Sequence, residues 1–203
     1  MSAPPKTKLV ATPREVAAIR AAVRAPDLSA FGPGRVLAGP EHAERLAELL
    51  SDPAVSDPIY DLPRPITVET VSAWIAACLR QRQAGEGLLM VNLDADGRLS
   101  GYSHVSVWPE RASAELAGAS RADLQGQGRG GTGAVATFNW IFEDLGARLM
   151  CLTAALDNVR SARLIDRAGF VRMGERDGVR PDGSIRRSLY WELTRDAWRA
   201  IAR

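Results

Sequence analysis

Five glycines fall within the eight residues 126–133, in the run Gln125-Gly-Gln-Gly-Arg-Gly-Gly-Thr-Gly133. Glycine has no side chain to bury and lowers helix and strand stability, so such a run does not serve core packing. It offers backbone N–H groups that a ligand can approach closely. The residues that follow, 134–145, have the pattern of a helix. A glycine-rich turn before a helix is a typical anion site, which predicts a ligand that carries phosphate.

Three known phosphate motifs can be compared with this run. A P-loop is excluded, because no Gly-Lys-Ser/Thr follows the glycines. A dinucleotide fingerprint is formally present as Gly126-x-Gly128-x-x-Gly131, but its first glycine must directly end a buried parallel strand. Here residues 121–125 intervene, which disfavours this alternative. The third possibility is a pyrophosphate loop of the form Gln125-x-x-Gly128-x-Gly130.

Further motifs stand at matching distances from this loop. Together they resemble the GNAT N-acetyltransferases over residues 34–198, in particular the branch of bacterial ribosomal-protein N-terminal (RimJ/RimL-type) acetyltransferases. The motifs are Gln125-x-x-Gly128-x-Gly130, Glu143-Asp-Leu-Gly146, Asn158-x-x-Ser161-x-x-Leu164, Arg167-Ala-Gly169-Phe170 and the two upstream segments 41–53 and 65–75.

The resemblance implies that acetyl-CoA donates its acetyl group directly to an amine. The diphosphate is expected on backbone N–H groups of the glycine run, where Gly128 and Gly130 tolerate substitution least. The pantetheine arm is expected along the edge of the central strand, and Asn158 beside it or as an N-cap. The expected cofactor-binding residues are Ala117, Gly118, Ala119, Ser120, Gln125, Gly126, Gln127, Gly128, Arg129, Gly130, Gly131, Thr132, Asn158 and Ser161.

Small residues at 117–120 are unusual for this family, where aromatic residues are common. They could widen the acceptor site or admit a bulkier acyl group. They could equally allow close packing of a helix on the sheet.

Glu115 is the expected general base, because it stands near the start of the central strand among apolar residues. Burial would raise its pKa toward the working range. An outward-facing strand residue is the alternative interpretation. His104, with Tyr102 on the same strand face, is a second candidate for the base.

Ser161 is the expected partner of the thiolate leaving group. Many members of the family use a tyrosine as the acid, and Ile165 stands at that place here. This departure keeps a second hypothesis open: a CoA-sensing or interaction module that retains the fold without turnover.

The acceptor is expected to be a protein N-terminus or a small amine. The segment 51–65, with four prolines, and the turn 178–185 would wall its groove. Tyr60, Asp57 and Asp61 could attract a cationic amine, although acids in loops are usually solvated.

Bulk composition agrees with one globular domain. The chain has 203 residues, a net charge of +2, two cysteines and two histidines. No nucleic-acid partner, metal site or membrane span is expected, and Cys78 and Cys151 are expected as buried free thiols in the cytoplasm. Residues 1–30 form an N-terminal extension that could cover the groove or serve a homodimer, and 31–203 form the acetyltransferase domain.

The elements that must position these residues follow from hydrophobic periodicity and from caps and breakers. An early hairpin and a later β-α-β-α-β run predict a mixed, mostly antiparallel central sheet of six to seven strands flanked by helices, an α/β (α+β) fold. The expected helices are 13–24, 40–50, 67–83, 134–145 and 161–168, and the expected strands are 35–37, 88–93, 99–108, 113–120, 148–156, 170–175 and 188–193.

Overall fold

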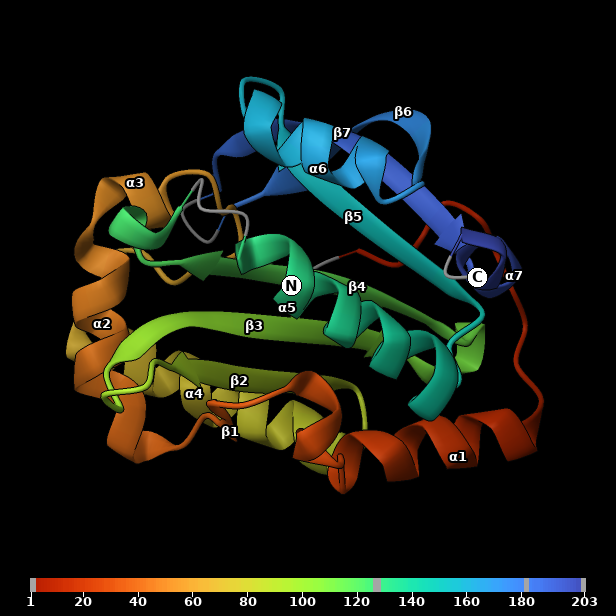
Figure 1. The fold of residues 1–203 in the computed structure, drawn as a ribbon, viewed down its shortest axis with the longest axis horizontal. Coiled ribbons are helices and arrows are strands. Elements are labelled where there is room, and N and C mark those ends of the chain that lie inside the picture. Colours follow the sequence, from red (N-terminus) through yellow and green to blue (C-terminus); the bar gives the residue numbers. More distant parts are fainter. Residues whose placement is uncertain (1–2, 126–128, 181–182, 202–203) are drawn as a thin grey trace.

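A seven-stranded sheet in the order β1-β2-β3-β4-β5-β7-β6 forms the centre of the computed structural model (Figure 1). All neighbouring strands are antiparallel except β4 and β5, which run parallel. The structure describes residues 3–125, 129–180 and 183–201. The strands are β1 (Arg35–Leu37), β2 (Gly87–Leu93), β3 (Leu99–Trp108), β4 (Ser113–Ser120), β5 (Leu149–Ala155), β6 (Val171–Val179) and β7 (Ile185–Thr194).

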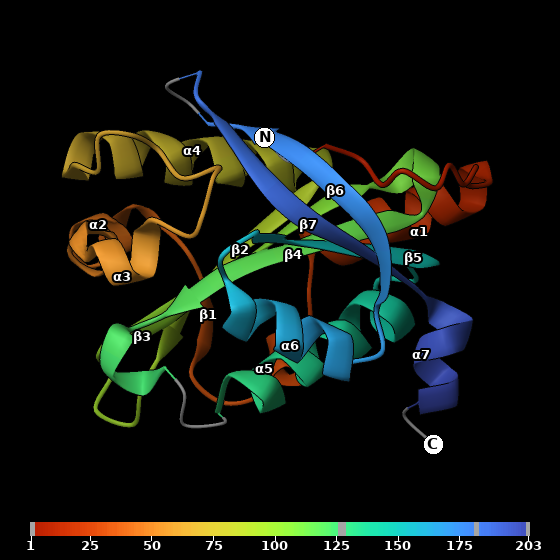
Figure 2. The ribbon, with the colours of Figure 1, turned by 90° about the horizontal axis from the view of Figure 1, so that it is seen from above.

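Helices cover both faces of this sheet (Figure 2). Because side chains alternate along a strand, Leu88 and Leu89 enter two different apolar clusters. The first cluster takes in α1 (Pro13–Arg24), α5 (Arg129–Asn139), α6 (Val159–Arg167) and α7 (Arg195–Ile201). The second takes in α2 (Ala43–Ser51), α3 (Pro53–Ser56) and α4 (Val68–Ala84). No helix within the described ranges has both the length and the apolar character to span a bilayer.

Several element boundaries predicted from capping residues are confirmed. Thr12 and Glu15 form a capping box at the start of α1, where Pro13 is the first helical residue. Thr67 caps α4, and Gly85 ends it in the left-handed conformation, with φ of 79°. The predicted sheet of six to seven mostly antiparallel strands is likewise confirmed.

Three helices differ from the prediction. The helix expected from residue 134 begins at Arg129 and continues into a π-turn at Trp140–Asp144. The sequence placed this start too late because glycine has a low helix propensity. The segment 51–65, expected as a loop, contains α3, which Asp52 caps in front of Pro53. Helix α7 was not predicted; it has seven residues and is held by the buried Trp198.

The N-terminal extension is integrated into the fold. Ile19 and Val23 of α1 are buried in the first apolar cluster. Before α1, the chain crosses β6 and β7: Arg176 donates hydrogen bonds to the carbonyls of Ala3 and Pro4, and the Thr7 N–H donates to Glu192 Oε1 at 3.0 Å. Residues 3–8 thus cover part of the same sheet face that α4 covers further along.

Candidate functional site

Strands β4 and β5 diverge in the middle of the sheet. They pair only over Ser113–Glu115 and Leu149–Cys151, whereas β4 pairs with β3 along its whole length. Beyond Glu115, no described strand pairs with the other edge of β4. The backbone groups of Ala117–Ser120 on that edge can therefore pair with an extended ligand, as in strand addition. This is the edge on which the sequence placed the pantetheine arm.

Gly118 is required by the approach of two strands. A Cβ built on Gly118 would lie 2.5 Å from the carbonyl oxygen of Tyr102 on β3. The close packing that the sequence suggested therefore exists, but the partner is the neighbouring strand rather than a helix. Ala117 and Ala119 are half-buried in the same stretch.

A cation that the sequence analysis missed, Arg35, lies beside the start of α5. The first N–H groups of a helix have no partner within it, so this end is positive. The Arg35 Nη2 lies 2.6 Å from the point that a Cβ on Gly133 would occupy, and its Nη1 donates to Ser103 Oγ at 2.7 Å. Burial lowers the pKa of Arg35. Among the described residues, no carboxylate lies within ion-pair distance of this guanidinium. A charged residue in a three-residue strand was the only sequence signal for it.

The glycine run is described only in part. Gly126, Gln127 and Gly128 lie outside the described residues, and Arg129–Thr132 form the first helical turn of α5. The Gln125 side chain donates from Nε2 to the Ser120 carbonyl at 2.9 Å. Its backbone N–H donates to Ala122 at 3.1 Å, so Gln125 ties the end of β4 to the loop rather than offering a free donor.

The start of α6 faces the same opening. Asn158 Oδ1 accepts a hydrogen bond from the Ser161 N–H at 3.1 Å, which confirms Asn158 as the N-cap. Ser161 is half-buried in the first turn. Ile165, at the place of the family's tyrosine, is buried in the first apolar cluster. Its side chain contributes to packing and has no group that could donate a proton.

Glu115 is buried, with 4 % of its surface exposed, so it is not the outward-facing residue of the alternative interpretation. The Thr153 hydroxyl lies 3.5 Å from Glu115 Oε1 and 3.3 Å from Arg186 Nη2. Thr153 therefore connects the Glu115 carboxylate to a guanidinium at the surface of the acceptor-side cleft described below.

His104 and Tyr102 lie on the same sheet face as Glu115, but they are packed under α4. Trp74 makes edge contacts with both rings, and His104 Nε2 lies 3.8 Å from Cys78 Sγ. Burial lowers the pKa of His104, while it raises the pKa of Cys78 to about 12. These groups are neutral at pH 7, and none of them lines the cleft.

A cleft of about 930 Å³ opens at the carboxyl end of β5. Its walls come from the two segments predicted to enclose the acceptor, 51–65 and 178–185, and from the start of α6. We call it the acceptor-side cleft. Its lining residues are Asp57, Pro58, Arg64, Ala155, Leu156, Asp157, Asn158, Arg160, Arg180, Arg186 and Arg187.

The charge of this cleft differs from the sequence prediction. Of the residues expected to attract a cationic amine, only Asp57 lines it. The Tyr60 ring already carries a cation, because the Arg186 guanidinium carbon lies 4.6 Å from its centroid. Five arginines face two aspartates in the lining, so the cleft favours negative charge. The sequence alone does not bring these arginines together, because they come from three separate segments of the chain.

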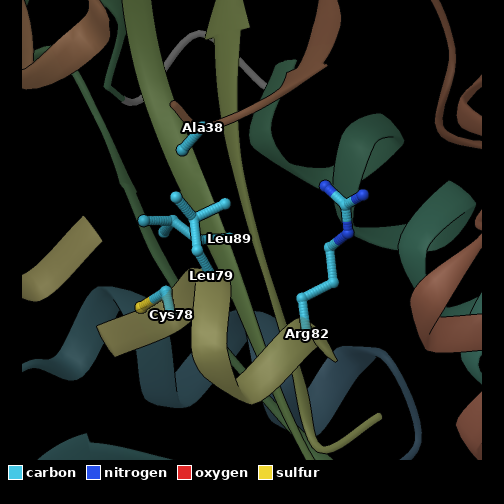
Figure 3. A pocket seen from close by; sticks show the side chains of 5 residues that line it. All are labelled: Ala38, Cys78, Leu79, Arg82 and Leu89. Carbon is cyan, nitrogen blue, oxygen red and sulfur yellow. The ribbon is translucent and has the colours of Figure 1, made fainter. Parts of the chain in front are cut away.

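A second hollow lies between α4 and β2 (Figure 3). It is lined by Ala38, Cys78, Leu79, Arg82 and Leu89. It has no volume that a water molecule could occupy, so it is a packing defect rather than a ligand site.

Comparison with known proteins agrees with this architecture. A family model described as an acetyltransferase (GNAT) domain matches residues 36–171. A search of curated proteins found no match.

Solved structures share the fold at low sequence identity. The ribosomal-protein-S5-alanine acetyltransferase from Vibrio fischeri has a TM-score of 0.68 at 16% identity, covering 81% of this chain and 93% of that one. The ribosomal L7/L12 α-N-protein acetyltransferase RimL, in complex with coenzyme A, gives 0.69 at 16% identity, with coverages of 82% and 97%. A mutant of spermidine N-acetyltransferase from Vibrio cholerae gives 0.65 at 15% identity, with coverages of 83% and 99%.

Proposed function

The chain belongs to the GNAT acetyltransferase family, whose members use acetyl-CoA, and on that premise we propose that it transfers an acetyl group directly to a primary amine. The observation that supports this most is the divergence of β4 and β5, which leaves the edge of β4 open beside the start of α5. A dinucleotide site binds its ligand at the end of a buried parallel strand and does not need an open strand edge.

The chain's own residues fit the cofactor on this side. We assign its diphosphate to the N–H groups at the start of α5, Arg129–Thr132, with Gly126, Gln127 and Gly128 before them. Arg35 adds a cation that has no carboxylate partner among the described residues. An anion beside Arg35 and the helix start would compensate two adjacent positive groups. The Ala117–Ser120 edge and the Asn158 amide would hold the pantetheine arm.

Glu115 is our proposed general base and Ser161 the proposed hydrogen-bond donor to the leaving thiolate. Glu115 faces the side of the sheet on which α4 packs, whereas Ser161 belongs to α6 on the opposite face, and the acceptor-side cleft is lined by residues of both α6 and β7. We infer that the amine and the cofactor meet at the gap between β4 and β5. Glu115 takes the proton that the amine must lose before it attacks.

Solved relatives indicate the range of acceptors, since their names specify ribosomal proteins and spermidine. A protein N-terminus or a small amine is accordingly the proposed acceptor here. Cys78 and Cys151 are buried free thiols, which supports a reducing compartment such as the cytoplasm.

Calorimetric titration of the purified protein with acetyl-CoA and, separately, with NAD(H) tests the proposal first. We expect binding of acetyl-CoA alone. Gly130→Glu should weaken it by about a hundredfold, because a carboxylate would repel the diphosphate at the helix start. Val135→Glu adds the same charge to the same helix at an exposed position and is the matched control.

Release of free thiol over a panel of peptides and small amines follows. Turnover on any amine supports the transferase. Stoichiometric binding of acetyl-CoA without turnover on any of them would favour the non-catalytic module, for which Ile165 at the tyrosine position is the specific argument. Binding of NAD(H) instead would overturn the proposal.

A further inference from the structure

The acceptor-side cleft contains more positive charge than its own carboxylates compensate. Arg187 is paired, because its Nη2 lies 2.5 Å from Glu175 Oε2. Arg64 is paired loosely, at 3.9 Å from Asp57 Oδ1. Within the described part of the chain, no carboxylate lies at ion-pair distance from Arg160, Arg180 or Arg186.

Arg186 distinguishes this cleft from an ordinary solvated surface. Only 8% of the residue is exposed, and burial lowers the pKa of its guanidinium, which nevertheless keeps its proton. Nε donates to Ser188 Oγ at 3.0 Å, Nη1 donates to the Pro58 carbonyl, and Nη2 donates to Thr153. Tyr60 lies against its face. The Asp61 and Glu115 carboxylates attract this cation from beyond ion-pair distance, but neither lines the cleft. An anion that approached Arg186 from the cleft would stabilise the buried cation further.

The position of Arg186 connects this positive charge to the proposed chemistry. Thr153 contacts both Arg186 and the proposed base Glu115. An anionic group bound to Arg186 would therefore be separated from the proposed base by one side chain, Thr153. Arg160, in the first turn of α6, and Arg180, at the end of the β6–β7 hairpin, reach the same cleft from two other elements.

We propose that the acceptor is an amine that carries a carboxylate or phosphate group, bound by Arg160, Arg180 and Arg186. The inference rests on the proposed acetyl transfer and specifies its substrate class. Guanidinium groups are suited to carboxylate and phosphate because they offer donors in a planar fork. A polycationic amine such as a polyamine is excluded from the cleft by the same charge.

Matched acceptors provide the test. Thiol release is measured with three C-terminally amidated peptides, Ser-Glu-Glu, Ser-Gln-Gln and Ser-Lys-Lys, and with free serine against serinamide. We expect kcat/KM for the acidic peptide to exceed that for the basic one by more than about tenfold. A preference for free serine over serinamide, without a preference among the peptides, would indicate a small amino acid as the source of the carboxylate. Equal rates throughout, or a preference for lysine, would overturn the proposal.

Variants connect that preference to the cleft. The double variant Arg160→Gln/Arg180→Gln should lose about tenfold in kcat/KM for the acidic acceptor and little for the neutral one. Arg80→Gln removes an exposed arginine on α4, away from the cleft, and should leave the preference unchanged. If the double variant instead weakens acetyl-CoA binding and keeps the acceptor preference, these arginines hold cofactor phosphate and the proposal fails.

A binding measurement separates this proposal from the proposed function. Calorimetry on the protein saturated with CoA compares Ser-Glu-Glu with Ser-Gln-Gln. Binding of the acidic peptide alone, lost in the double variant, supports an anionic ligand in the cleft even if no turnover is found. If the acidic peptide does not bind better, the inference is wrong although acetyl transfer to other amines stands.

Discussion

Two positive regions lie near the gap between β4 and β5, one at the start of α5 and one in the acceptor-side cleft. The first obtains much of its charge from backbone N–H groups, with Arg35 as the added cation among the described side chains. The second is built from guanidinium side chains on α6, on the β6–β7 hairpin and on the segment between α3 and α4.

The difference indicates which ligand each region is suited to. Backbone donors at a helix start suit one constant group, since any residue without a bulky side chain supplies the same N–H. Side chains can be exchanged one at a time, so the cleft is the region in which specificity can change while the cofactor site stays the same. We therefore expect variants of the two regions to separate cofactor binding from acceptor selection.

The largest expected effect comes from Glu115, which lies between the two regions. Glu115→Gln should lower kcat by at least about a hundredfold, because general base catalysis contributes that much, and should leave the Kd of acetyl-CoA unchanged. Steady-state kinetics and calorimetry on the same preparation measure both. His104→Gln is the matched control on the same sheet face and should change kcat little. If the two variants behaved the other way round, His104 would be the base and Glu115 a buried structural carboxylate.

Arg35 tests whether the cofactor site depends on a side chain as well as on the backbone N–H groups of α5. Arg35→Gln should raise the Kd of acetyl-CoA about tenfold, since a charge-assisted hydrogen bond to phosphate is lost, without changing acceptor preference. Arg35→Lys should restore part of the affinity. Arg82→Gln removes another half-buried arginine, on the opposite face, and serves as the control. An unchanged Kd in Arg35→Gln would mean that backbone donors suffice.

The same contrast explains what the sequence could predict. Gln125, Gly128 and Gly130 lie within one short segment next to a helix, so their spacing alone indicated phosphate. Asn158 was predicted as a cap because a cap is local. Arg186 owes its role to Pro58, Thr153 and Tyr60, three residues far from it in the chain, and no local pattern contains that information.

The fold shows the same division. Strands β2 and β3 and helix α4 were predicted within one residue or two of their bounds, since periodicity and caps determine them. The start of α5 was placed five residues too late because glycine has a low helix propensity, although the helix in fact begins at Arg129. The divergence of β4 and β5 could not be predicted, because register between strands depends on packing across the sheet.

Variants of residues 3–8, which lie on the same sheet face as α4, test whether this segment has only a structural role. Burial would raise the pKa of Glu192, but hydrogen bonds from Thr7 and Tyr190 outweigh it and hold that pKa below its usual value. Because this pKa is depressed, its stabilising contribution is present at neutral pH and is lost as the pH falls through the acid range.

Thr7→Val should therefore lower the free energy of unfolding at pH 7 by about 1 kcal/mol. The variant should also lose less stability than the wild type on acidification, as urea titrations at pH 7 and pH 4 would measure. Acceptor preference should stay unchanged, which would assign specificity to the cleft and not to the cover. A changed preference in Thr7→Val would include residues 3–8 in the acceptor site.

The smallest effect is expected at Ser161, on the cofactor side. Ser161→Ala should lower kcat only about threefold, because the bond lost is one weak hydrogen bond from a neutral hydroxyl to the partial charge that develops on the leaving sulfur. Stability should not change, since Asn158 is bonded to the Ser161 backbone N–H, which alanine keeps. Asn158→Ala is the informative partner: it removes the cap and should cost about 1 kcal/mol of stability as well as cofactor affinity. A fall in kcat of a hundredfold in Ser161→Ala, with stability intact, would instead assign Ser161 the proton donation that the family's tyrosine performs. The cofactor side would then depend on a side chain as strongly as the acceptor side does.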